Sequence, residues 1–296
     1  MAGVLFWRVM FKRQTTGSVV CTSCGQLVGV NDATCYNCGR RNPGLWGFAP
    51  ALRSLGHDMG FVPFVTGLCV VVYVLMLIMS RGEIQSSGLM NLLAPSTYAS
   101  LLFGASGSFP VFQLDRWWTV LSASWLHGNL LHIFFNVMWI RQLAPAIGEI
   151  YGPSRMIIIY TFASITGFAL SSLAGELLWW MPIYFLRGAQ LTVGASAAIF
   201  GLLGAAVYYG RRSGSSHASK IGLQYAVLLG IFGLIFPGVD NYAHAGGFLG
   251  GYLTARILDP LKPERVDHLV IAGVCLLATL LAIVASIITA LPLLLQ

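Results

Sequence analysis

Seven apolar segments constrain the fold of this chain most strongly, because each is near the length of about 20 residues that a helix needs to cross a bilayer. Hydrophobic residues make up 56% of the 296 residues and charged residues only 9%, against about 25% in soluble domains. The sequence therefore predicts an all-α polytopic membrane protein rather than a soluble globule. The predicted spans are residues 61–79, 126–143, 156–173, 193–209, 221–236, 242–258 and 269–291.

The basic residues predict the orientation of these spans. If the N-terminus is cytoplasmic, all but three of the 17 Lys and Arg residues fall in cytoplasmic segments, the exceptions being Arg81, Arg116 and Arg187. Such asymmetry is typical of membrane proteins, so the formal net charge of +7 requires no nucleic-acid partner. We expect a multi-pass protein of a bacterial inner membrane with a cytoplasmic N-terminus.

Four cysteines near the N-terminus have the spacing of a zinc site. Cys21 and Cys24 form one C-x2-C pair, and Cys35 and Cys38 form a second. Two such pairs supply the four thiolates of a tetrahedral zinc site, and four thiolates leave no open position for a substrate. We therefore expect a structural zinc ion in a zinc-ribbon-like segment. Two disulfides are the alternative, which a cytoplasmic location disfavours.

The N-terminal segment contains further features of less specific meaning. Residues 1–20 mix basic with apolar side chains, which suits either an amphipathic stretch on the membrane surface or a mobile tail. The cysteine segment could bind a protein partner, regulate the chain or only stabilise itself. The predicted parts are an N-terminal segment (1–42), a linker (43–60), a membrane domain of six spans (61–258) and an additional C-terminal helix (259–296).

Two of the predicted spans are rich in small residues and each carries one chemically reactive side chain. Residues 193–206 contain Ser196, and residues 242–255 contain His244. Small residues allow two helices to pack closely in a membrane, and both side chains fall at similar depth toward the outer side. The pattern favours a nucleophile–base pair, although a lone serine in a membrane helix usually serves packing.

Polar residues at membrane depth are costly and usually functional, and the second predicted span has three of them, His127, His132 and Asn136. The last two lie four residues apart and share a helix face, where both can donate hydrogen bonds to an oxyanion. A divalent metal held by the histidines is an alternative. Asp240 precedes His244 by four residues, and we expect it to cap a helix N-terminus.

The segments HGNLLHIFFN, GASAAIFG and AHAGGFLGG together resemble the rhomboid intramembrane serine proteases, over residues from about 61 to 258. The resemblance implies that Ser196 is the nucleophile and His244 the general base, with no cofactor for catalysis. It also implies oxyanion-side roles for His132 and Asn136, to which we add Gly194 and its neighbouring backbone. The seventh span is similar to that of the six-plus-one variant of the family.

Two positions depart from the pattern of the family. The long loop before the histidine cluster often carries Trp-Arg, whereas this chain has Trp118-Thr119 with Arg116 nearby. One turn after the serine, many members have a tyrosine that stacks on the histidine, and this chain has Phe200. The first departure puts the anchoring of the loop in doubt, and the second removes a hydroxyl.

The function implied by the resemblance is an intramembrane endopeptidase that cleaves transmembrane segments of membrane proteins. The alternative is a proteolytically inactive rhomboid-like protein that binds membrane clients. A transporter that uses the histidines is a third reading, but the central spans lack the acidic residues that it would use. The long loop at residues 80–125 is apolar enough to lie in the membrane interface, where Trp117, Trp118 and Trp125 would suit that level.

Overall fold

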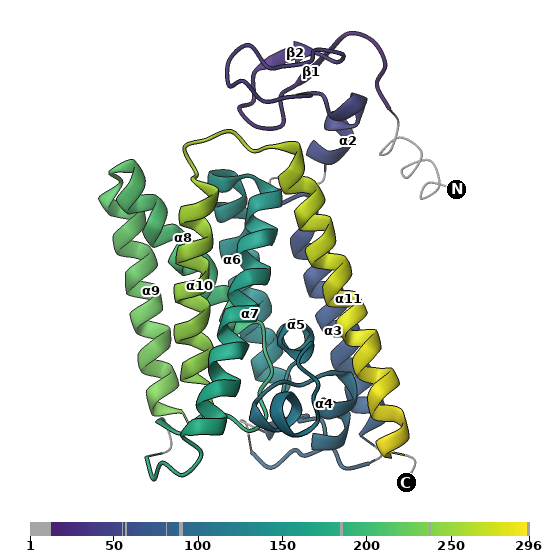
Figure 1. The fold of residues 1–296 in the computed structure, drawn as a ribbon, viewed down its shortest axis with the longest axis vertical. Helices are drawn as coiled ribbons and strands as arrows, with labels where there is room; N and C mark the ends of the chain where they lie inside the picture. Colours follow the sequence, from purple (N-terminus) through teal and green to yellow (C-terminus); the bar gives the residue numbers. More distant parts are fainter. Residues whose placement is uncertain are drawn as a thin grey trace.

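The computed structural model describes residues 13–294 except 55, 57, 81, 89, 90, 184, 185 and 237, so most of the predicted amphipathic stretch lies outside the described residues. The described chain is mostly helical, and its long helices stand side by side with a small cysteine module at one end (Figure 1). The long helices are α3 (Phe61–Met79), α6 (Leu130–Tyr151), α7 (Pro153–Leu177), α8 (Ser196–Ser213), α9 (Ser216–Ile235), α10 (Asn241–Leu258) and α11 (Val266–Leu294).

A long helix occupies each of the seven predicted spans, and the all-α architecture is confirmed. Within the described residues, five helices are long and apolar enough to cross a membrane, namely α3, α6, α7, α9 and α11. The shorter helices α8 and α10 fall outside this group because glycine and polar residues lower their hydropathy. The chain is a multi-pass integral membrane protein, while the crossing of the membrane by α8 and α10 stays a prediction.

The predicted start of the second span was wrong by four residues. Helix α6 begins at Leu130, because the side chain of Asn129 accepts a hydrogen bond from the N–H of His132 and so caps the helix. His127 therefore lies in the turn before the helix rather than on its face. His132 and Asn136 lie within α6 as predicted.

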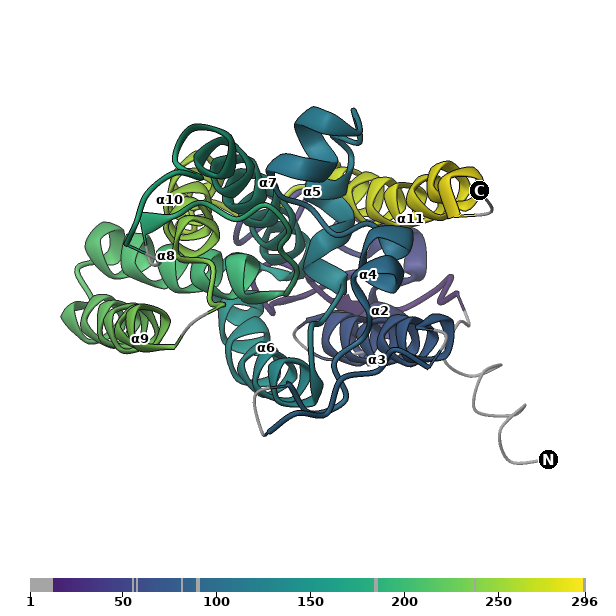
Figure 2. The same cartoon turned by 90° about the horizontal axis from the view of Figure 1, so that it is seen from below.

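The connecting loop, residues 80–125, contains several short helical segments. It contains α4 (Thr97–Phe103), a π-helical turn η3 (Phe109–Gln113), α5 (Thr119–Ser122) and η4 (Ala123–Trp125). Seen from below, α5 lies between α7 and α11, and α4 lies beside α11 (Figure 2). The prediction that Trp125 lies in the membrane interface was wrong, because its side chain is buried against Phe64 and Tyr160. Trp117, in contrast, is exposed.

Helices α8 and α10 pack backbone to backbone. A side chain added at Gly247 would overlap the carbonyl of Ala197, and one added at Gly251 would overlap the backbone of Gly201. Such contact is the arrangement that small residues allow between membrane helices. It brings the start of α8 and the start of α10 to the same end of the bundle.

The cysteine module (residues 18–42) contains a two-stranded antiparallel sheet of β1 (Ser18–Val20) and β2 (Leu27–Gly29). The predicted linker after it is not irregular throughout, since it forms η1 (Leu45–Gly47) and α2 (Ala49–Arg53).

The module is fixed to the helices by Glu264. Its carboxylate lies 3.3 Å from the guanidinium of Arg40, with both side chains at most 4% exposed. The same carboxylate accepts the backbone N–H groups of Ser154 and Arg155 at the start of α7.

Candidate active site

Ser196 and His244 lie in contact although 48 residues separate them in the sequence. Oγ of Ser196 is 2.9 Å from Nε2 of His244, within hydrogen-bond distance. Ser196 is the first residue of α8, and His244 lies in the first turn of α10 and is buried. The close packing of the two helices therefore joins the hydroxyl to the imidazole.

The backbone before Ser196 is held in a strained turn. Gly194 has a φ of 129°, which L side chains rarely adopt, and a Cβ there would overlap the ring of His132. The N–H of Gly194 donates to the carbonyl of Ala123 at 2.9 Å. Because this N–H already has an acceptor, Gly194 contributes the shape of the turn here rather than a free donor.

The ring of His244 is oriented by an aromatic side chain rather than by a carboxylate. The ring of Phe200 stacks on it, with centroids 4.1 Å apart and planes 14° from parallel. Nδ1 of His244 is buried and has no hydrogen-bond partner among the described residues. Asp240 accepts from the N–H of Ala243 and from the hydroxyl of Ser171, which confirms the predicted helix cap.

His132 lies beside the turn that precedes Ser196, as the near overlap at Gly194 requires. Its Nδ1 accepts the N–H of Gly128 at 3.3 Å, so a proton on the ring would reside on Nε2, which faces Gly194. Asn136 is buried on the same face and donates to the carbonyl of His132 at 2.8 Å. The described contacts join Asn136 to His132 and not to Ser196.

His127 is fully buried, and its ring lies edge-on to that of His132 at 5.2 Å. Within the described chain, the three histidines do not come close enough to form a metal-ligand group, whereas the four cysteines do. The predicted alternative of a histidine-bound metal therefore has no support in this arrangement.

The start of α8 also offers backbone donors. The first N–H groups of an α-helix have no acceptor within the helix, and the helix dipole adds partial positive charge at that end. The N–H groups of Ser196 and Ala197 belong to this turn. An oxyanion formed next to Oγ of Ser196 would therefore meet donors that are already fixed in place.

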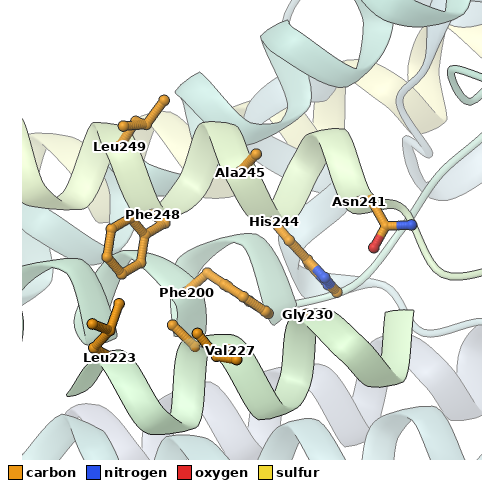
Figure 3. A pocket seen from close by; sticks show the side chains of 10 residues that line it. Phe200, Leu223, Val227, Gly230, Asn241, His244, Ala245, Phe248 and Leu249 are labelled. Atoms are coloured by element: carbon orange, nitrogen blue, oxygen red, sulfur yellow. The ribbon is translucent and has the colours of Figure 1, made fainter. Parts of the chain in front are cut away.

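An apolar groove of about 330 Å³ opens beside His244, between α9 and α10. Figure 3 shows Phe200 and His244 at its floor, with Leu223 and Val227 of α9 along one wall. Helix α9 covers the groove loosely, because only 11% of its apolar segment is buried inside the protein, against 67% of that of α7. The groove gives an extended chain a route to the imidazole.

The four cysteines of the module form a compact cluster whose sulfur atoms all lie within 4.8 Å of one another. The Sγ atoms of Cys21 and Cys38 are 3.8 Å apart, and those of Cys24 and Cys35 are 3.6 Å apart. A tetrahedron of thiolates with zinc–sulfur bonds of about 2.3 Å has edges of about 3.8 Å. The cluster therefore fits a zinc ion.

The two C-x2-C turns repeat one hydrogen-bond pattern. The N–H of Gly25 donates to the carbonyl of Cys21, and the N–H of Gly39 donates to that of Cys35. Burial works against the thiolate and raises the pKa of Cys21 and of Cys38, but N–H and side-chain donors near Cys24 outweigh it there and lower the pKa of that thiol to about 6. A thiol that ionises this readily is suited to bind a metal.

A comparison with known protein families identifies the region around the serine and histidine. Residues 114–260 match the family model of the Rhomboid domain. The chain contains a rhomboid domain. The matched region contains Ser196, His244, His132 and Asn136, and it ends before α11.

Curated relatives agree with this assignment. The chain is 30% identical over 186 residues to the "Rhomboid protease GluP" of Bacillus subtilis, and the aligned region covers 62% of this chain and 34% of that protein. It is 31% identical to "RHOMBOID-like protein 4" of Arabidopsis thaliana, over 61% of this chain and 44% of that protein. A third relative, 27% identical over 58% of this chain and 47% of its own length, is "Inactive RHOMBOID-like protein 8" of Arabidopsis thaliana. The chain thus spans about half or less of the length of these relatives.

Sequence reasoning missed two contributors to the site. The carbonyl of Ala123 holds the turn before Ser196, and a backbone carbonyl leaves no signal in a sequence. Arg116 anchors the connecting loop with its guanidinium buried. The sequence marks it only as one of three basic residues outside the cytoplasmic segments and as the arginine nearest to a departure from the family motif, although a basic residue in an apolar loop is itself a signal.

Proposed function

We propose that this rhomboid protein is a serine endopeptidase that cleaves transmembrane segments of membrane proteins with Ser196 and His244. The observation that carries the proposal is the 2.9 Å contact between Oγ of Ser196 and Nε2 of His244 at the N-terminus of a helix. A serine hydroxyl is a weak nucleophile until an adjacent base removes its proton. The contact supplies that base.

The geometry suggests how each group acts. Oγ of Ser196 attacks the carbonyl carbon of the peptide bond while Nε2 of His244 takes the hydroxyl proton and later gives it to the leaving amine. Water then attacks the acyl ester, and His244 again takes and returns a proton. The N–H groups at the start of α8 stabilise the oxyanion, and Nε2 of His132 is a further candidate donor.

The substrate we propose is a transmembrane helix that unwinds near its end. Peptide bonds within a helix are shielded, so cleavage should favour segments with small or helix-breaking residues. The groove beside His244 offers a path from the lipid side, with the loosely packed α9 as the element that moves. No cofactor takes part in these steps.

We also propose that the site opens to the outer side of a bacterial inner membrane and that the cysteine module is cytoplasmic. The basic residues support this orientation. Protease digestion in sealed vesicles tests it, since the module should be cut only in vesicles whose cytoplasmic face points outward. Digestion from the opposite side would overturn the orientation.

We propose that the cysteine cluster holds one structural zinc ion. The sulfur separations support this assignment, and four thiolate ligands leave the ion no open position. Metal analysis of the purified protein tests it. One zinc ion per chain is expected in the wild type and in Cys275→Ser, which changes a cysteine outside the cluster, and none in Cys24→Ser.

The protease proposal is tested by comparing the wild type with Ser196→Ala in proteoliposomes that contain a single-span substrate. A matched control is Ser164→Ala, which removes a buried serine whose hydroxyl bonds within α7. We expect cleavage by the wild type and the control and none by Ser196→Ala. Labelling by a serine-directed phosphonate probe should follow the same pattern.

The alternative function is an inactive rhomboid-like protein that binds membrane clients. It predicts binding of single-span proteins with neither cleavage nor labelling of Ser196 by the probe. If Ser196→Ala cleaves as fast as the wild type, another nucleophile or a contaminant is responsible and the proposed dyad is wrong.

A further inference from the structure

The connecting loop is bonded to helix α11, which lies outside the matched rhomboid region. The guanidinium of Arg116 donates to the carbonyl of Leu101 in α4 at 2.9 Å and to the carbonyl of Ser286 in α11 at 2.7 Å. The indole N–H of Trp118 donates to the hydroxyl of Ser286 at 3.1 Å. One residue of α11 thus accepts two hydrogen bonds from a loop about 170 positions away.

The hydrogen bond between Arg116 and Ser286 is buried, which makes it costly to lose, while the other two bonds are partly buried. Arg116 is 2% exposed and Ser286 is fully buried. Both acceptors described for the guanidinium are backbone carbonyls, so the buried positive charge is stabilised only where these two carbonyls stay in place. Gly104 at the end of α4 lies so close that a Cβ there would overlap the hydroxyls of Ser122 and Ser286.

A continuous set of hydrogen bonds leads from Arg116 to the turn that carries Ser196. The hydroxyl of Thr119, at the start of α5, donates to the carbonyl of Arg116 at 2.7 Å. Helix α5 continues into Ala123, whose carbonyl accepts the N–H of Gly194, two residues before Ser196.

A second connection runs in parallel. Ser106 and Thr192 exchange both of their backbone hydrogen bonds, at 3.0 and 2.7 Å. The hydroxyl of Thr119 also lies 3.3 Å from that of Ser106. The turn before Ser196 is therefore held on two sides by the same loop.

We infer that Ser286 of α11, acting through Trp118 and Arg116, is a positioning residue for the active-site turn. This inference rests on the proposed function only for its effect on the rate. Helix α11 then belongs to the scaffold of the active site, because it supplies the fixed point from which the loop holds Gly194 and the nucleophile. A shift of about 1 Å in such a scaffold can lower a rate by about a hundredfold.

The test compares Ser286→Ala and Arg116→Lys with the wild type. The matched control is Thr279→Val, because Thr279 is also a buried hydroxyl residue of α11 but bonds to the carbonyl of Cys275 within its own helix. The first measurement is hydrogen exchange in peptides covering residues 190–197. We expect faster exchange at the amide of Gly194 in both test variants and no change in the control.

The second measurement is the kinetics of the same proteins. Ser286→Ala removes the acceptor of Trp118 but keeps the backbone carbonyl that accepts from Arg116. We therefore expect kcat and the rate of probe labelling at Ser196 to fall about tenfold in Ser286→Ala, with KM nearly unchanged, and further in Arg116→Lys. The double variant Trp118→Phe/Ser286→Ala should have the same kcat as each single variant. Each single change already breaks the one hydrogen bond between the two side chains, so the second change removes nothing more.

The outcomes separate this inference from the proposed function. Unchanged exchange at Gly194 in both test variants, with faster exchange confined to the connecting loop, would overturn the inference even if Ser196 is the nucleophile. The wild type could instead neither cleave substrate nor react with the probe, while Ser286→Ala and Arg116→Lys still exchange faster at Gly194. That result would uphold the positioning role and reject the protease proposal.

Discussion

The cysteine cluster and the Ser196–His244 pair are assembled by different means. The cysteines lie within 18 consecutive residues (21–38), and two local turns of identical pattern bring their sulfur atoms together. Ser196 and His244 lie on separate helices and meet only because α8 and α10 pack at their glycines. Local chain geometry makes the first site, and long-range packing makes the second.

The two regions also differ in what stabilises them. The apolar core of the cysteine module consists of three valines beside the cysteines, and a core of this size is too small to fold a segment without a further source of stability. The pair lies inside a bundle with a large apolar core. Loss of metal should therefore unfold the module and leave the pair in place, while a change in helix packing should disrupt the bundle and the pair and leave the module folded.

The largest effect is expected from Gly251→Val. The new side chain would overlap the backbone of Gly201 and force α8 and α10 apart, which should destabilise the bundle by about 3 kcal/mol and abolish cleavage. Gly273→Val is the matched control, because nothing lies within 4 Å of the Cβ position there. Thermal unfolding and cleavage assays measure both. Equal stability of the two variants would contradict the packing account.

A smaller, local effect is expected from removal of the metal. With a chelator, or in Cys24→Ser, hydrogen exchange should become fast across residues 18–42 because the small core cannot hold the module. Exchange at the start of α8 and α10 should stay slow. Cys69→Ser changes a buried cysteine in α3 and serves as the control for the substitution. Melting of the helices together with the module would show that the two regions are not independent.

The smallest effect is expected from Glu264→Gln, which tests the contact between the two regions. The amide can still accept from the start of α7, but Arg40 loses its buried counter-charge, which weakens the contact between the two regions without unfolding either of them. The module should stay folded while residues 43–60 become more sensitive to protease. Glu149→Gln, at an exposed carboxylate of α6, is the control. Equal protease sensitivity of the two variants would mean that the ion pair does not hold the module in place.

The sequence predicted most of the elements because their signals are local. Apolar length identified the seven long helices, and the C-x2-C spacing identified the cysteine cluster. The predicted cap at Asp240 was confirmed because it depends on four consecutive residues. The start of α6 was wrong because the polar residues His127 to Asn129 were assigned to a span, whereas Asn129 ends the turn and caps the helix.

The contacts that sequence reasoning could not supply are long-range. Trp125 appeared suited to the membrane interface but packs inside the bundle, and its burial depends on where α3 and α7 lie. Thr119 replaces the arginine that the family pattern places in this loop, so the sequence alone does not show how the loop is anchored. The structure instead shows Arg116 bonded to α11, a partner about 170 residues away that no motif connects to it.

The sequence by itself determined the class of the protein, the number and order of its long helices, the cysteine cluster and the candidate residues Ser196 and His244. These follow from composition, from spacing along the chain and from motifs in a fixed order. Only the tertiary structure decided which residues surround the serine, how closely the ring of Phe200 stacks on that of His244, and that Ala123 holds the turn. The physical reason is that hydrogen bonds and ring contacts between distant segments depend on the exact register and angle at which the helices pack. Small residues predict that two helices come close, but they do not specify that geometry.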